Sequence, residues 1–328
     1  MPSEDKRKDH FVSKTYLRRF STNHNLYVFD KKNNKFIEPQ TKSICCQIGW
    51  DILQVDEYKY ALRNLLQQIE PSLNNALNRI THNVFQIDDR IIISHYLAIL
   101  GTLNPSFLAK MKHDKERIIQ QTLLMLIECG KIKVPDEMKT KIGNKNPFKI
   151  KIDDNHLKTE LIQPLLEYIP LIYRSPWIIL KNTSDKDYIT SDNPFQFMAC
   201  PHNAPVYPRF IALDPKHILL MLPPFDIGNK LQYNKTFFTH QNAGSLKILE
   251  TQETDLFNIY TISNATQFII LGKRNSALKE FVINNKNIKT ENKVSEFGSI
   301  FFSRLCCNRS IQEKNADFNK LLNILSAN

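Results

Sequence analysis

The sequence predicts an α+β fold with an N-terminal β-hairpin, a helical middle block and a mixed or antiparallel sheet in the C-terminal half. Three observations support this class: strand-like runs around the polar connection DKKNNK (30–35), a helix-spaced apolar stripe after residue 56, and clustered short strands after residue 174. Clustered strands favour α+β over a doubly wound sheet, in which strands alternate with helices. With 328 residues, 42% of them hydrophobic, the chain can bury a large core, and we expect a single domain over 1–328.

The first segment, residues 9–55, contains a motif and the predicted hairpin. The motif, DHFVSKTYLRRFS (9–21), combines one His, two adjacent Arg and three aromatic side chains. In NLYVFDKKNNKFIEP (25–39), aromatic and β-branched residues flank a polar stretch. This pattern predicts two short strands joined by a turn.

The second segment, residues 56–173, has the spacing of helices. Apolar residues at steps of three and four predict an amphipathic helix after Asp56, and Pro71 either kinks it or starts a second helix. Asp88 and Asp89 stand where an N-cap and a first-turn acid belong, ahead of the apolar stretch 90–103. A third helix is expected over about 106–129, ending at Gly130.

The Lys-rich stretch 131–151 is expected to form an exposed connection or a lid over a site. Residues 156–173 are expected to form one further helix. The sheet-forming half, 174–283, contains the short apolar runs WIILKN, YIT, RFIALD, HILLMLP and QFIILG, which predict strands. The run SLKILETQETDLFNIYTISNA (245–265) is expected to form a helix before the last of these strands. Residues 284–328 form a C-terminal extension.

Two motifs together resemble the bacterial domain-of-unknown-function 4238 family. HFVSKTYLRRF and LYVFDKKNNKF are followed by a helical middle and then by ITSDNPF (189–195), and the likeness covers roughly residues 10–275. The family commonly has Pro where this chain has Ser13. The resemblance carries over to the following residues: His10, Phe11, Tyr16, Leu17, Arg18, Phe20, Ser191, Asp192, Asn193 and Pro194. It implies a map of sites without a reaction, because the family has no settled activity.

The first motif could serve chemistry or packing. His10 has an ordinary pKa near neutral pH and could move a proton, and guanidinium groups suit phosphate or carboxylate. On a helix, Arg18 and Arg19 cannot both point inward, so one of them faces solvent. The predicted roles are acid/base catalysis for His10 and substrate binding for Arg18, Arg19 and Tyr16. The alternative is that the aromatic residues pin the N-terminus to the core.

The second motif follows a predicted strand and ends in an Asp-Asn-Pro turn. Asp192 could act as a base or hold Mg²⁺ or Mn²⁺, while Ser191 takes a catalytic role and Asn193 binds substrate. The alternative is a structural turn in which Asp192 accepts main-chain N–H groups. A metal nuclease needs two or three carboxylates, and no spacing to Asp192 matches such a set.

The composition limits which binding partners and which cellular compartment are expected. The net charge of +11 favours a polyanion such as nucleic acid, although Lys and Asn interleaved throughout the chain also fit an A+T-rich genome. Adjacent cysteine pairs without a C-x-x-C spacing indicate reduced thiols. The longest apolar stretch, 91–103, is too short to cross a bilayer, and the charged N-terminus lacks a signal peptide, so we expect a cytoplasmic protein with no transmembrane segment.

Two function classes remain open. The first is an enzyme acting on a phosphate-bearing substrate, most readily a nuclease-like protein, with His10, Arg18 and Asp192 around one cleft. The second is a non-catalytic binding, scaffold or sensor protein associated with a bacterial defence or toxin system.

Overall fold

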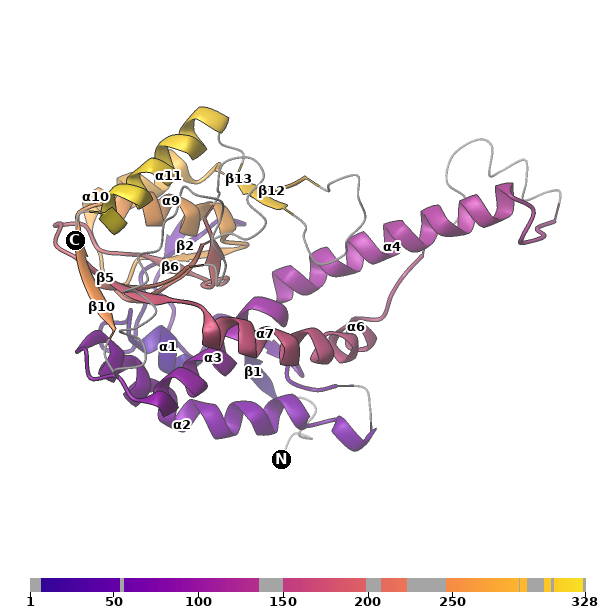
Figure 1. The fold of residues 1–328 in the computed structure, drawn as a ribbon, viewed down its shortest axis with the longest axis horizontal. Helices are drawn as coiled ribbons and strands as arrows, with labels where there is room; N and C mark the ends of the chain where they lie inside the picture. The colour runs from indigo at the N-terminus through magenta and orange to yellow at the C-terminus, as the bar shows by residue number, and fades with distance from the viewer. Residues whose placement is uncertain are drawn as a thin grey trace.

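The computed structural model describes residues 7–53, 56–135, 150–198, 208–222, 246–288, 290–293, 304–307 and 310–326. It confirms the α+β class: helices cover two sheets, and one long helix projects from the body (Figure 1). Most of the stretch considered as a lid or solvated loop, 136–149, lies outside the described residues.

The N-terminal hairpin forms where the sequence predicts it. Strands β2 (Val28–Asp30) and β3 (Lys35–Ile37) pair antiparallel, with Val28 opposite Ile37. Before them, β1 (Lys8–His10) pairs antiparallel with β4 (Cys46–Ile48), and the short helix α1 (Lys14–Arg18) follows β1. The first motif therefore forms a strand and a helix that lead into the hairpin.

The helical block begins with a 3₁₀ turn, η2 (Asp56–Tyr58), and α2 (Ala61–Thr81). Pro71 lies inside α2, which continues as one helix. Helix α3 (Ile87–Thr102) has Asp88 and Asp89 in its first turn, and the Asp89 side chain completes a capping box with Gln86.

The expected single helix over 156–173 is wrong, because the structure has two, α6 (Asp154–Glu160) and α7 (Ile162–Arg174). Pro164 explains the break: it has no N–H to donate to the carbonyl of Glu160, and proline is tolerated in the first turn of a new helix.

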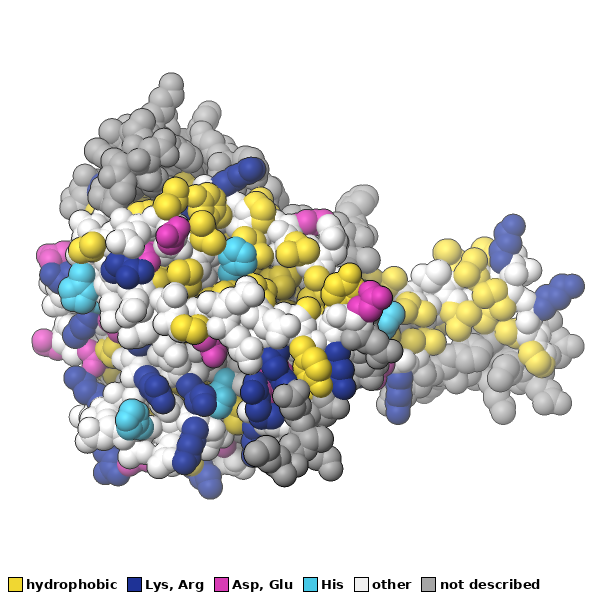
Figure 2. Space-filling model, turned by 90° about the horizontal axis from the view of Figure 1, so that it is seen from below, with side chains coloured by type: hydrophobic (Ala, Val, Ile, Leu, Met, Phe, Trp, Pro, Cys, Tyr) yellow, Lys and Arg dark blue, Asp and Glu magenta, His cyan; other side chains and the backbone are white. Residues whose placement is uncertain are grey.

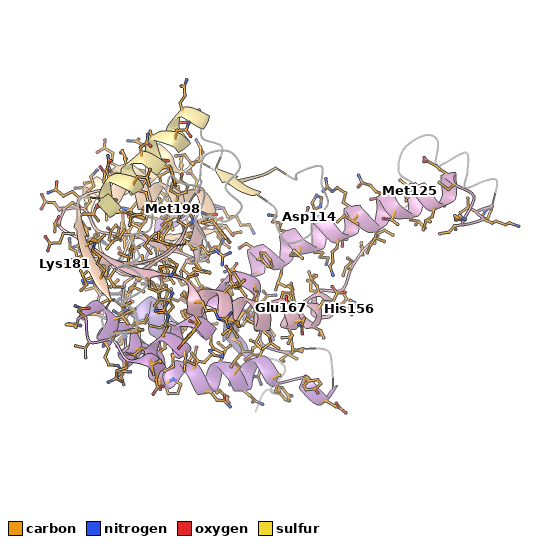
Figure 3. The ribbon with its side chains drawn as sticks, viewed as in Figure 1. Asp114, Met125, His156, Glu167, Lys181 and Met198 are labelled. Carbon is orange, nitrogen blue, oxygen red and sulfur yellow. The ribbon has the colours of Figure 1, made fainter. Side chains whose placement is uncertain are left out.

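Helix α4 (Pro105–Glu128) ends next to Gly130, which has a φ of +68°. Its outer part stands away from the body, with Asp114 and Met125 along it (Figures 1 and 3). Met111 is the only buried residue described on α4, and Figure 2 shows apolar side chains on the projecting part. No single helix in the described ranges is long and apolar enough to span a membrane, whereas α3 and α4 together, bent by 46°, pass that test by length and composition.

A five-stranded sheet forms the centre of the second half. Its order is β10 (Lys247–Thr251), β5 (Trp177–Asn182), β9 (His217–Met221), β8 (Arg209–Asp214) and β7 (Gln196–Phe197). Strands β10 and β5 are parallel and the other neighbours are antiparallel, so the sheet is mixed.

The expected helix over 245–265 is wrong in its first part. Lys247–Thr251 forms β10, which pairs with all of β5, and helix α9 (Thr254–Asn264) begins after it. Pairing with a buried neighbouring strand overrides the local helical pattern, which is only a weak preference.

A second sheet, of four strands, joins the N-terminal hairpin to strands from the second half of the chain. Its order is β3, β2, β11 (Phe268–Ile270) and β6 (Thr190–Ser191), all antiparallel. One strand, β11, thus lies between the hairpin and β6 of the second motif. The C-terminal part adds α10 (Ser276–Asn285), β12 (Thr290–Lys293) paired with β13 (Arg304–Cys307), and α11 (Ile311–Ser326), which lies over α9 and α10 in Figure 1.

Candidate functional site

The two sequence motifs meet in the core through Tyr16. The Tyr16 hydroxyl lies 2.7 Å from the Thr190 hydroxyl and 2.7 Å from the main-chain oxygen of Ala212, to which it donates. Tyr16 is fully buried, and burial raises the pKa of its phenol. This contact ties α1 to β6 and β8, and it leaves Tyr16 no access to a substrate.

Helix α1 separates its two arginines. The Arg19 guanidinium turns inward, where Nε donates to the Leu213 main-chain oxygen at 2.7 Å, Nη1 donates to Asn78 at 2.5 Å, and Nη2 lies 3.3 Å from Asp214. Arg18 is exposed, and the described residues give its side chain no ion pair. Only Arg18 is therefore placed to meet a ligand.

His10 ends β1 and is partly buried. Its Nε2 atom is buried and has no hydrogen-bond partner in the structure. Burial and then the positive charge of Lys14 lower the pKa of His10, which keeps the imidazole neutral at neutral pH. The neutral ring thus keeps one nitrogen without a hydrogen-bond partner, and this nitrogen is enclosed by protein.

The neighbouring Asp9 points the other way, into a buried ion-pair cluster. The Arg63 guanidinium donates to Asp51 at 2.9 and 3.0 Å and to Asp9 at 3.3 Å, while Arg7 reaches Asp9 at 2.5 Å. Since side chains alternate along a strand, this cluster fixes the face of β1 on which His10 lies.

In the second motif, Ser191 and Asn193 form a local turn. The Ser191 hydroxyl donates to the Asn193 main-chain oxygen at 2.9 Å and accepts from the Asn193 N–H at 3.2 Å. The Asn193 amide donates to the Asn264 main-chain oxygen at 3.3 Å, which ties the turn to the end of α9. Catalysis by Ser191 and substrate binding by Asn193 stay predictions, and the hydrogen bonds of both side chains stabilise the turn.

Asp192 is buried and anchors the loop between α9 and β11. One carboxylate oxygen accepts the Thr266 N–H at 2.9 Å and the other accepts the Gln267 N–H at 2.7 Å. Its own main chain donates to Phe268 and accepts from the Asn104 side chain. Burial raises the pKa of Asp192, while the three main-chain N–H groups around it act in the opposite direction.

This arrangement favours the structural alternative for Asp192, because both oxygens already have donors. The described residues contain no group of three His, Cys, Asp or Glu side chains that could hold a metal ion. Binding of Mg²⁺ or Mn²⁺ by Asp192 stays a prediction. Within the same part of the chain, no hydrogen bond or ion pair joins His10, Arg18 and Asp192.

Comparison with protein families shows that residues 8–275 match a protein family of unknown function (DUF4238). The chain belongs to the DUF4238 family. No curated protein and no solved structure matches it. Both motifs of this DUF4238 protein lie inside the matched range, and α11 lies beyond it.

Four exposed cations near the first motif add to the candidate site: Lys8, Lys14, Arg18 and Lys42. Sequence reasoning singled out only Arg18, because lysines are spread through the whole chain. The signal was available, since all four lie within 42 residues of the start, but their common surface depends on how β1, α1 and the loop after the hairpin pack.

Arg209 is a second residue that the motifs did not reveal. Its guanidinium lies between two aromatic rings, 4.4 Å from the centroid of Tyr168 and 4.7 Å from that of Phe197. Its Nε atom is buried without a hydrogen-bond partner, and burial lowers the pKa of Arg209 to about 9. The rings, which come from α7 and β7, stabilise the cation where the described residues supply no carboxylate.

A cavity of about 1000 Å³ lies beside β4, α4 and α6 and contains both charge signs. The Lys158 ammonium is buried and donates to the main-chain oxygens of Gly49, Trp50 and Ile52 at 3.2–3.4 Å. Lys112 is paired with Asp154 at 2.6 Å. These charges already have partners, so this cavity is a weaker candidate for an anionic ligand.

Proposed function

We propose that this DUF4238 protein binds a phosphate-bearing ligand, with nucleic acid the first candidate, through the surface around His10. The observation that carries the proposal is the set of four exposed cations Lys8, Lys14, Arg18 and Lys42, called here the N-terminal basic face. Among the described residues none of the four forms an ion pair. Unpaired cations on one surface attract a polyanion, and the net charge of +11 adds a long-range field of the same sign.

The local geometry supports one common surface. Lys8 and His10 lie on the same side of β1, opposite to the buried Asp9. Lys14 and Arg18 are four residues apart in α1 and therefore lie on one helix face. The view from below, the side on which α2 and β1 lie in Figure 1, shows Lys and Arg side chains with few acidic ones among them (Figure 2).

The test is binding of fluorescent single-stranded RNA and DNA by anisotropy at several salt concentrations. Four phosphate contacts predict a slope of about −3 in log K against log salt, since each contact on a single strand contributes about −0.7. The double variant Lys14→Ala/Arg18→Ala should weaken binding roughly tenfold and flatten the slope by about 1.4. Lys131→Ala, an exposed lysine after α4, is the control and should leave the slope within about 0.7 of the parent value.

Binding that is absent, or equally weakened by Lys131→Ala, would overturn the proposal, because the attraction would then come from total charge or not exist. Unfolding curves of the double variant should stay close to those of the parent, since both side chains are exposed and neither forms an ion pair or a hydrogen bond among the described residues.

A second candidate is the nuclease-like enzyme, favoured by one observation: the neutral His10 has a buried nitrogen without a hydrogen-bond partner, and the charge of Lys14 acts on the ring. His10 would then move a proton at the ligand that the basic face holds. Incubation of bound RNA and DNA with Mg²⁺ or Mn²⁺ tests it. Cleavage that His10→Gln abolishes while binding persists supports the enzyme, whereas binding without cleavage supports the scaffold or sensor alternative linked to a bacterial defence or toxin system.

A cytoplasmic location belongs to this proposal. Nucleic acid is present there, and the three described free cysteines, Cys45, Cys46 and Cys129, suit a reducing compartment.

A further inference from the structure

A second cavity, of about 720 Å³, lies on the hairpin side of the four-stranded sheet. Three segments that are far apart in sequence form its walls: the turn of the hairpin, the end of α9 with the loop after it, and the end of α10. The volume is within the range of pockets that hold small organic ligands. This cavity is larger than one phosphate ion needs.

Lysines dominate the wall. Lys31, Lys32 and Lys286 line the cavity, and none of the described lining residues is acidic. Asn34 and Asn287 add amide groups that can donate hydrogen bonds. The wall therefore offers cations and neutral donors to an anion.

Two of the lysines are held in position. The Lys31 ammonium donates to the main-chain oxygens of Ile262 and Ala265 at 3.0 and 2.9 Å, at the C-terminal end of α9. The Lys286 ammonium donates to the Asn34 side chain at 2.6 Å and so joins α10 to the hairpin turn. The Lys31 charge is partly balanced by the partial negative charge at the C-terminal end of α9. The net positive charge of the cavity therefore comes mainly from Lys286 and the exposed Lys32.

Two aspartates, Asp30 and Asp192, lie beside these walls, and neither lines the cavity. Asp30 accepts the main-chain N–H groups of Lys32 and Asn33 at 3.0 and 3.1 Å and the Asn33 amide at 2.7 Å. Asp192 accepts the N–H groups of the α9–β11 loop, as described above. Both carboxylates thus shape the loops, which explains how the second motif contributes to a site without facing it.

We propose that this cavity binds a nucleotide-sized organic phosphate, with the phosphate between Lys32 and Lys286 and the amides of Asn34 and Asn287 on the rest of the ligand. An ammonium is a point charge suited to phosphate oxygens, and a third fixed cation, Lys31, supports a doubly charged group. This site is distinct from the N-terminal basic face and shares no residue with it.

Calorimetric titration of the full chain with ADP and with pyrophosphate, without divalent metal and at low salt, tests the proposal. We expect saturable binding of ADP that Lys32→Ala/Lys286→Ala weakens at least tenfold and that Lys32→Ala alone weakens several-fold. The matched control is Lys35→Ala/Lys279→Ala, which removes two lysines from the same hairpin and the same helix but outside the cavity wall. The control should bind ADP as the parent does.

The outcomes separate the possibilities. No saturable binding of either probe at millimolar concentration, or equal weakening by the control variant, overturns the proposal. Pyrophosphate binding tighter than ADP binding overturns the nucleotide-sized ligand, whereas tighter ADP binding supports it. Because Lys14→Ala/Arg18→Ala should still bind ADP and Lys32→Ala/Lys286→Ala should still bind RNA, failure at one site is distinguishable from failure at the other. Lys32→Ala removes an exposed side chain, so its fold is expected to persist and its titration remains interpretable.

Discussion

Replacement of Asp192 by alanine tests whether the second motif is structural. The side chain is 6% exposed, and its two oxygens accept two main-chain N–H groups at 2.9 and 2.7 Å. Leaving a buried donor without an acceptor costs about 1–3 kcal/mol. The donors belong to a loop that water partly reaches, so Asp192→Ala should lower the free energy of unfolding by about 2–4 kcal/mol in total. Asp192→Asn keeps one acceptor oxygen and should cost less.

Urea unfolding followed by circular dichroism measures this loss, with and without Mg²⁺ or Mn²⁺. The control is Asp185→Ala, which removes an exposed carboxylate from the connection between β5 and β6 and should change the free energy by less than about 0.5 kcal/mol. The loss at Asp192 should be the same with and without metal.

An unchanged free energy of unfolding in Asp192→Ala would refute this reasoning, since the two N–H groups would then not depend on the carboxylate. A parent protein that metal stabilises, with the stabilisation lost in Asp192→Ala alone, would instead establish Asp192 as a metal ligand.

Three further predictions follow from single contacts. Tyr16→Phe removes the hydroxyl that joins the two motifs and should lower the free energy of unfolding by about 1–3 kcal/mol, measured in urea. Gly272→Ala should lower the melting temperature more than Gly130→Ala does: both residues have positive φ, +84° and +68°, but only at Gly272 would a Cβ meet a main-chain oxygen, that of Phe20, at 3.0 Å. Equal effects would show that this contact relaxes freely. Burial lowers the pKa of His10 in the folded protein, so the unfolded chain takes up the proton at a higher pH than the folded protein does. The stability that the neutral His10 contributes is therefore complete above about pH 6.5, and it is lost as the pH falls from there through the pKa of the folded state. The urea midpoint should therefore drop less between pH 7 and pH 5 in His10→Gln than in the parent, and an equal drop would contradict the assignment.

The strands and helices were largely predictable because local patterns reflect burial. The runs WIILKN and RFIALD became β5 and β8 with the predicted bounds, and α4 ends beside Gly130 as its sequence indicates. The errors occurred where a local pattern met a distant partner. Residues 247–251 pair with β5 as a strand and are not part of the expected helix. Pro164 lies where one expected helix is divided into two, although the apolar spacing is continuous.

The candidate site was less predictable than the fold. Helical spacing correctly implied that only one of Arg18 and Arg19 faces inward, whereas the functional roles of the two motifs stay predictions. Helical spacing does not predict, however, how deeply a side chain is buried. The structure shows Tyr16 and Asp192 buried against hydroxyl and main-chain groups, which no local pattern of these residues reveals.

By itself, the sequence determined the α+β class, the hairpin, most element bounds and the excess of positive charge, because these depend on local spacing and on composition. Only the tertiary structure decided which cations lie together. The N-terminal basic face depends on where β1, α1 and the loop after the hairpin lie in the folded chain, and the lysine-lined cavity requires the hairpin turn to meet the ends of α9 and α10, more than 200 residues away in the chain. A charge acts on a ligand through distance in space, and the chain sets that distance only when it folds.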